Sequence, residues 1–241
     1  MKSSALTDIG SKRKINQDSI FSTDDAIGKL PNLYIVADGM GGHKAGDYAS
    51  RECIEAMTSY IKEYNDICTP ISVLEYAIYT ANINICNDSR SNQELEGMGT
   101  TVVAATVVDG MIYVANVGDS RLYIVQDNNL IQLTQDHSLV EEMVKRGEIT
   151  ESDARIHPNK NIITRALGSG DNVVVDFFEI EADKVDRVLL CSDGLTNMVD
   201  DTEIMDVILH SDNIEKATRI LVDKANKYGG KDNISVILVE M

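Results

Sequence analysis

Short runs of hydrophobic residues, a pattern typical of β-strands, recur in both halves of the chain. Residues 1–40 contain several such runs, and residues 100–134 contain four more, separated by turns of two to four residues. Because connections this short permit only antiparallel pairing, residues 100–134 are predicted to form an antiparallel meander. Further strands are expected at residues 173–180, 187–192 and 234–239.

Apolar side chains recur every three or four residues in four other segments, as on the buried face of a helix. Two of these segments, residues 49–64 and 71–85, follow the first strands, and two more, at about 201–209 and 214–228, precede the last strand. Without a regular alternation of strand and helix, this order favours an α+β fold over a doubly wound parallel sheet. Two antiparallel sheets packed face to face, with helices outside them, would bury every apolar face.

The segment at about 136–170 differs from the rest, because it is long, polar and only weakly apolar. Such segments between regular elements are usually functional. Only three prolines occur in the 241 residues, and no Gly/Ser-rich linker divides them. Residues 1–241 are therefore predicted to form a single domain.

The net charge of −17, from 39 acidic and 22 basic residues, argues against binding to a nucleic-acid backbone. The four cysteines show no CxxC spacing and are expected to be reduced. Met1 is followed by polar sequence rather than a signal peptide, and no apolar stretch approaches the roughly 20 residues of a membrane span. We expect a soluble, cytoplasmic monomer with no membrane or nucleic-acid partner.

Carboxylates mark the edges of the apolar runs. Rigid scaffolds hold their chemistry at strand ends, so these groups are candidates to converge. At an effective dielectric of 20, each close pair would repel by about 4 kcal/mol, which cations must neutralise. Oxygen ligands select Mg²⁺ or Mn²⁺ over zinc. The five aspartates are Asp18, Asp38, Asp119, Asp193 and Asp232.

Taken singly, most of these motifs also fit ordinary structural roles. Arg13 offers a planar fork for phosphate, but an arginine near Asp18 is more often a surface contact. Asp38 begins a glycine-rich stretch that also suits a plain strand-to-helix turn. Asp119 lies in a tight turn, where aspartate is common. The Asp-Gly pair at Asp193 repeats that at Asp38, which a turn role accounts for less well.

Six motifs occur in a fixed order along the chain: RKINQDS, VADGMGGH, MGTT, NVGDSR, SDGL and KDN. In order and spacing they resemble the PPM (type 2C) family of metal-dependent Ser/Thr protein phosphatases, in its compact bacterial form. The resemblance covers essentially the whole chain. It implies a four-layer αββα sandwich of two antiparallel sheets flanked by helices, with metal ions in a cleft at one end.

The resemblance also implies roles for individual residues. Asp38 is similar to the carboxylate that bridges two core metal ions, and Gly39 to the residue that supplies a backbone carbonyl ligand. Asp193 and Asp232 resemble ligands of one core ion. Asp18 resembles the residue near the other core ion, often acting through water. The expected cofactors are two core Mg²⁺ or Mn²⁺ ions and a third, weaker one.

Further positions complete the implied site. Asp119 is similar to the ligand of the third metal ion, shared with Asp193, and Arg13 to the phosphate-binding arginine. Where eukaryotic members have a proposed general-acid histidine, this chain has Met40, and His43 follows three residues later. Bacterial relatives share this form, so His43 is a candidate acid. The other three histidines are expected on the surface or in the segment 136–170, which resembles the family's mobile flap.

The expected activity is hydrolysis of phosphoserine and phosphothreonine in proteins, by a hydroxide that bridges two metal ions and attacks phosphorus in line. Phosphorylated Ser/Thr proteins, including a partner Ser/Thr kinase, are the partners that the resemblance implies. Two alternatives belong to another class of function, binding without catalysis. A pseudophosphatase would bind phosphoproteins without hydrolysis, and a metal-regulated interaction module would need the carboxylates but not Arg13.

Overall fold

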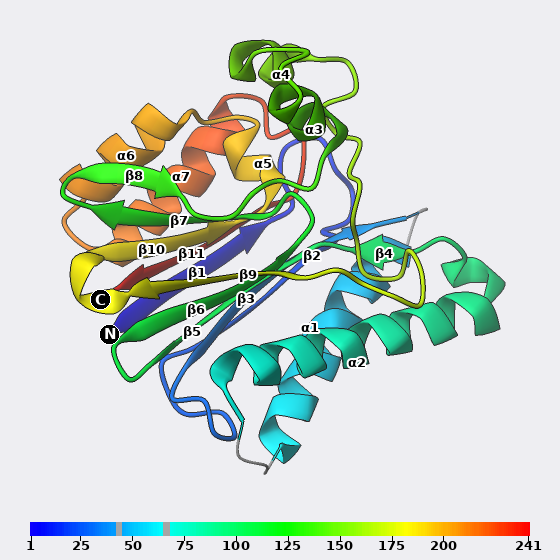
Figure 1. Ribbon diagram of the computed structural model, residues 1–241. Helices are drawn as coiled ribbons and strands as arrows, with labels where there is room; N and C mark the ends of the chain where they lie inside the picture. Colours follow the sequence, from blue (N-terminus) through cyan, green and yellow to red (C-terminus); the bar gives the residue numbers. More distant parts are fainter. Residues whose placement is uncertain (42–44, 65–67) are drawn as a thin grey trace.

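Two antiparallel sheets pack face to face, and helices cover the outer face of each (Figure 1). The computed structural model describes residues 1–41, 45–64 and 68–241. One sheet has the order β1 (Lys2–Asp8), β11 (Ile234–Glu240), β10 (Arg187–Cys191), β7 (Arg121–Gln126), β8 (Asn129–Gln132). The other has β2 (Asp18–Thr23), β3 (Leu33–Met40), β5 (Val102–Val108), β6 (Met111–Val117), β9 (Asp176–Glu181), with β4 (Gly99–Thr100) paired to β3.

The helices divide between the two sheets as the predicted α+β sandwich requires, which confirms the fold class. The sheet containing β3 is covered by α1 (Ala45–Glu63) and α2 (Pro70–Ser91). The sheet containing β11 is covered by α5 (Asp193–Thr196), α6 (Asp201–His210) and α7 (Ile214–Lys227). There are also two 3₁₀ helices, η1 (Gln93–Leu95), which packs with the layer of α1 and α2, and η2 (Ala182–Lys184), which connects β9 to β10.

Strand β3 shows why the sequence has continuous apolar runs rather than alternating ones. Leu33, Ile35 and Ala37 pack under α1 and α2, whereas Tyr34 and Val36 pack between the two sheets. Successive strand residues point to opposite faces, so a strand buried on both sides needs apolar residues at every position. The sandwich therefore contains three apolar layers, one between the sheets and one under each helical layer.

The prediction of one antiparallel meander over residues 100–134 is wrong at its middle. Strands β5 and β6 pair in one sheet, and β7 and β8 pair in the other. Between them the three residues Gly118–Ser120 carry the chain from one sheet to the other. Gly118 has φ of 109°, a left-handed value that favours glycine and turns the strand out of its own sheet. Asp119 thus lies where the two sheets meet.

Strand β9 begins later than the expected 173–180. Its register with β6 ends with Asn116 opposite Asp176, one residue before β6 ends at Val117. In that register Val173 and Val174 would lie beyond the end of β6, so they have no residue of that strand to pair with. All four cysteines are free thiols, as expected, but Cys68 is exposed, whereas the apolar neighbours of the cysteines predict that all four are buried. In the described part of the chain, no helix combines the length and hydropathy that crossing a bilayer requires.

The segment 136–170 is a structured flap at one end of the sandwich (Figure 1). It contains α3 (Leu139–Lys145) and α4 (Glu151–Ile156). Side chains cap both helices: Ser138 accepts from the amide of Glu141, and Thr150 forms a capping box with Asp153. The two ends of the flap pair through an antiparallel bridge between Ser138 and Ile163, which forms its neck.

Candidate metal and phosphate site

The five predicted aspartates lie at one end of the sandwich, drawn from both sheets. Asp18 opens β2 directly opposite Asp38 in β3. Asp193 opens α5 after β10, Asp232 precedes β11, and Asp119 lies in the crossing between β6 and β7. Burial raises the pKa of Asp38 well above its ordinary value, and the charges of the other four aspartates raise it further. The fold thus brings together carboxylates from distant segments.

Asp18 is the most enclosed of these carboxylates, with 6% of its surface exposed. Its Oδ2 accepts hydrogen bonds of 2.7 Å from the hydroxyls of Ser192 and Ser235, which belong to the opposite sheet's side of the interface. Its Oδ1 is buried and has no partner among the described residues. Burial raises the pKa of Asp18 to about 7, although both serine hydrogen bonds act to lower it.

The backbone at Asp38 is held by Thr101. The Asp38 amide donates to Thr101 Oγ1 at 3.0 Å, and the Thr101 amide donates to the Asp38 carbonyl at 2.9 Å. The same Oγ1 lies 2.7 Å from Ser120 Oγ, in the crossing that carries Asp119. One buried threonine therefore links the two turns on which Asp38 and Asp119 stand.

Gly39 lies where two backbone segments approach closely. A Cβ at this position would come within 2.0 Å of the Gly46 carbonyl oxygen and 2.6 Å of the Gln17 carbonyl oxygen. No side chain fits there, because both obstacles are backbone atoms. Glycine is required at this strand end for packing, independently of any role for its carbonyl as a ligand.

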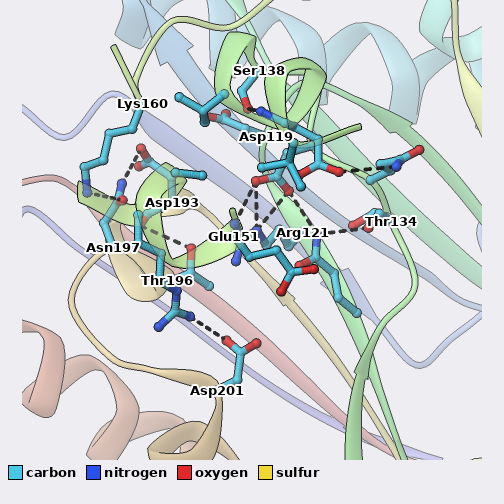
Figure 2. A pocket seen from close by; sticks show the side chains of 18 of the residues that line it. Asp119, Arg121, Thr134, Ser138, Glu151, Lys160, Asp193, Thr196, Asn197 and Asp201 are labelled. Atoms are coloured by element: carbon cyan, nitrogen blue, oxygen red, sulfur yellow. Dashed lines mark hydrogen bonds and ion pairs between the residues drawn. The ribbon is translucent and has the colours of Figure 1, made fainter. Parts of the chain in front are cut away.

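Asp193 is linked to the flap through one intermediate side chain, as Figure 2 shows. Its Oδ2 accepts from Asn197 Nδ2 at 2.8 Å, and Asn197 Oδ1 accepts from Lys160 Nζ at 2.8 Å. The other oxygen, Oδ1, is buried without a partner in the described part of the chain. Burial, with the charge of Asp232, raises the pKa of Asp193 to about 6.

Arg13 lies at the open edge of the site. Its Nη2 forms an ion pair of 2.7 Å with Asp232 Oδ2, and the Arg13 side chain is 47% exposed. The other Asp232 oxygen accepts from the amide of Asn233 at 2.8 Å. The guanidinium is thus held against one carboxylate of the cluster while much of it faces solvent, a position from which it can reach an incoming phosphate.

Asp119 lines a pocket of about 560 Å³ between the flap helices and the end of the sandwich (Figure 2). Asp193 lines the same pocket from α5, and Lys160 lines it from the flap. Burial, together with the charge of Asp193, raises the pKa of Asp119 to about 8. A substrate group entering this pocket would meet both carboxylates.

The predictions made for the individual histidines differ in how they compare with the structure. His43 lies outside the described residues, so its predicted role as general acid remains a prediction. His137 was expected on the surface or in the flap, and it does lie at the flap's neck, but only 4% of it is exposed. His210 is exposed. The sequence contains no signal for the burial of His137, because its immediate neighbours are polar.

The residues around the aspartates fit hard divalent cations. One oxygen of Asp18 and one of Asp193 are buried and find no hydrogen-bond partner in the described part of the chain, which is costly unless a cation satisfies them. Within the described residues, no three Asp, Glu, His or Cys side chains are grouped closely enough to ligate one ion by themselves. Mg²⁺ in proteins is usually held by one or two carboxylates and keeps several waters, which suits this open arrangement.

Sequence reasoning missed the groups that support the aspartates. Ser192 and Ser235 hold Asp18, Thr101 holds Asp38, and Asn197 holds Asp193. Thr101 stands within the MGTT motif and Ser192 within SDGL, so membership of a motif was the available signal. For Ser235 and Asn197 the sequence contains none that we recognise.

Comparisons with known proteins agree with this geometry. The family model described as "Protein phosphatase 2C" matches residues 10–233. The serine/threonine phosphatase stp of Listeria welshimeri is 44% identical over 239 residues, covering 97% of this chain and 93% of its own. The crystal structure of the serine/threonine phosphatase Stp1 from Staphylococcus aureus superposes with a TM-score of 0.93 at 34% identity, covering 100% of this chain and 94% of its own.

A further structure is similar and contains metal ions. It is the catalytic domain of the serine/threonine protein phosphatase PstP in complex with two manganese ions, with a TM-score of 0.88 at 31% identity. The similarity covers 99% of this chain and 97% of that one.

Proposed function

This chain belongs to the protein phosphatase 2C family and is a serine/threonine protein phosphatase, and we propose that it uses divalent metal ions held by its converged aspartates. The observation that carries the proposal is a pair of buried carboxylate oxygens, one on Asp18 and one on Asp193, that have no partner among the residues the structure describes. They lie where the two sheets meet, in a protein whose structural relative PstP binds two manganese ions.

Each aspartate has a proposed place in this site. We assign Asp38 and the Gly39 carbonyl to the two core ions. Asp193 and Asp232 are assigned to one of these ions, and Asp18, which stands opposite Asp38 in the sheet, to the neighbourhood of the other. Asp119 is assigned to a third ion that it shares with Asp193, since both line the pocket under the flap. Mg²⁺ or Mn²⁺, when bound, supplies Lewis-acid activation of water and neutralises charge that develops on the phosphate.

The chain's own residues position the substrate for this chemistry. Arg13, held at 2.7 Å from Asp232, binds two phosphate oxygens through the remaining face of its guanidinium. Its attachment to Asp232 places the phosphate at the edge of the carboxylate cluster. The buried serines fix Asp18, so little reorganisation accompanies the reaction. His43 is proposed to protonate the departing serine or threonine oxygen.

Proteins phosphorylated on serine or threonine are the substrates, and a Ser/Thr protein kinase, which supplies them, is the proposed partner. The relatives are named as phosphatases, which gives no support to the alternative of binding without hydrolysis. The apolar layer shared by both sheets supports a single phosphatase domain over residues 1–241. The net charge of −17 supports a protein with no nucleic-acid partner, which we propose acts as a cytoplasmic monomer.

The test is Mn²⁺-dependent release of phosphate from a phosphothreonine peptide. Asp193→Asn should lower kcat/KM by at least about 100-fold, within the range for losing electrostatic stabilisation of the transition state, while the protein remains folded. Arg13→Ala should act mainly on KM. The matched control is Asp206→Asn, an exposed aspartate of α6 that should leave activity unchanged. Full activity of wild type in excess EDTA would overturn the metal mechanism.

A further inference from the structure

His137 occupies the neck of the flap and is buried. Its carbonyl accepts from the amide of Thr164 at 2.7 Å, which joins the outgoing chain of the flap to the returning chain. Its amide donates to the Gly118 carbonyl at 3.0 Å. The backbone of this one residue is therefore bonded both to the flap and to the sheet crossing that carries Asp119.

The ring of His137 repeats this double attachment. Its Nδ1 lies 3.0 Å from the amide nitrogen of Gly118, and its Nε2 lies 3.0 Å from Asp176 Oδ2. A backbone N–H can only donate, so Nδ1 is the acceptor and the ring proton is on Nε2, which donates to Asp176. Arg165 Nη1 then bonds to Asp176 Oδ1, at 2.8 Å, rather than to the ring.

Hydrogen bonds and close packing both constrain Gly118. Both of its peptide hydrogen-bonding groups are engaged by His137, and a Cβ on it would come within 2.5 Å of the Thr101 side chain. Gly118 has a left-handed φ of 109°, and its carbonyl also accepts a longer bond of 3.4 Å from Asn116 Nδ2. Because Asp119 is the next residue, the direction of its side chain follows from how this turn is held.

We propose that His137 is a positioning residue for Asp119, aligning it for the third metal ion and tying that alignment to the neck of the flap. The inference rests on the proposed function, because it takes Asp119 as a metal ligand. The flap and the weakest metal site are then coupled through one imidazole. Its Nδ1 acts on the Asp119 turn, and its Nε2 acts on the flap through Asp176 and Arg165.

Two substitutions separate the two ring nitrogens. In His137→Asn, the amide Oδ1 takes the place of Nδ1 and keeps the bond to Gly118, but Asp176 is out of reach. In His137→Gln, the amide Nε2 takes the place of the ring Nε2 and keeps the bond to Asp176, but the Gly118 amide loses its acceptor. If His137 only supported the fold, each variant would lose Mn²⁺ affinity in proportion to its loss of unfolding free energy, whichever ring nitrogen it replaced.

The experiment counts bound Mn²⁺ by electron paramagnetic resonance of the free ion, on the full chain. His137→Gln should weaken the lowest-affinity Mn²⁺ site about 10-fold, the lower end of the range for outer partners of metal ligands, and leave the tighter sites unchanged. His137→Asn should bind Mn²⁺ within about 3-fold of wild type, while hydrogen exchange in residues 139–163 becomes faster. Intact tight sites show that both variants are folded. The exposed His210 provides the control, His210→Asn, which should change neither readout.

The same substitutions in an Asp119→Asn background complete the test. If His137 acts through Asp119, His137→Gln should have no further effect on Mn²⁺ binding in that background. Equal loss in His137→Asn and His137→Gln, or an undiminished effect without Asp119, would overturn the inference while leaving the metal mechanism intact. Failure of wild type to bind Mn²⁺ at all would instead overturn both.

Discussion

Replacing Asp18 by asparagine should stabilise the protein when no divalent cation is present. Asparagine has nearly the same shape, and its Oδ1 can accept the same two hydrogen bonds from Ser192 and Ser235. The substitution therefore removes the negative charge, at the cost of placing an amide NH₂ where the buried Oδ1 has no partner among the described residues. In the metal-free protein that charge is buried next to other carboxylates, so its removal is favourable.

The expected size follows from the pKa of Asp18. Burial raises this pKa from 3.8 to about 7, so the folded state binds the proton more tightly than the unfolded chain does. The group's contribution to stability is therefore greatest below pH 3.8 and is lost as the pH rises through about 7. At about 1.36 kcal/mol per pKa unit, an aspartate at this position costs about 4 kcal/mol at pH 7.5, where it is largely ionised in the folded protein. At pH 5 the folded protein holds it protonated and the cost falls to about 1.5 kcal/mol.

Urea unfolding followed by circular dichroism measures this difference. In EDTA, Asp18→Asn should exceed wild type in unfolding free energy by up to about 4 kcal/mol at pH 7.5, with a smaller gap at pH 5. In saturating Mg²⁺ the gap should close or reverse, because ligand binding stabilises the folded wild type and the variant lacks one carboxylate. Asp206→Asn, on an exposed helix face, should be neutral under every condition.

A variant no more stable than wild type in EDTA at pH 7.5 would refute the reasoning, since it would mean that Asp18 is not destabilising when ionised. A gap unchanged by Mg²⁺ would contradict a different step. It would show that cations do not neutralise this carboxylate.

Two further predictions concern the groups around the site. Gly39→Ala should unfold or inactivate the protein, because its Cβ would lie 2.0 Å from the Gly46 carbonyl oxygen; a thermal melt within about 2 °C of wild type with full activity would contradict this. Lys160→Met should lose the hydrogen bond to Asn197, so that hydrogen exchange in residues 151–160 of the flap becomes faster with little change in Tm. Unchanged exchange would show that the link from Lys160 through Asn197 to Asp193 does not hold the flap.

Much of the fold was predictable because the spacing of apolar residues along the chain indicates which faces of a strand or helix are buried. The double-sided burial of β3 requires an unbroken apolar run, and the helices need stripes at intervals of three and four residues. The helix predicted over residues 71–85 is α2 (Pro70–Ser91), and the two late helices match α6 and α7. In each case the pattern reflects contacts that the element makes with a single neighbouring layer.

Sheet membership was not predictable from short connections. The turns at Asp109–Gly110 and Asp127–Asn129 join paired strands, whereas Gly118–Ser120 joins strands of different sheets. All three turns are short and polar, and sequence alone does not separate them. What distinguishes Gly118 is its surroundings, where Thr101 and His137 hold it in a left-handed conformation.

For the site, the chain itself identified the carboxylates, because each one stands at the end of an apolar run, where burial would otherwise favour an uncharged residue. Only the packed structure decided which groups hold them. Ser192 and Ser235 reach Asp18 across separations of 174 and 217 residues, and His137 is buried although its neighbours in sequence are polar. Hydrogen bonds of this kind depend on how the two sheets are aligned on each other. The periodicity of the local sequence contains no information about that alignment.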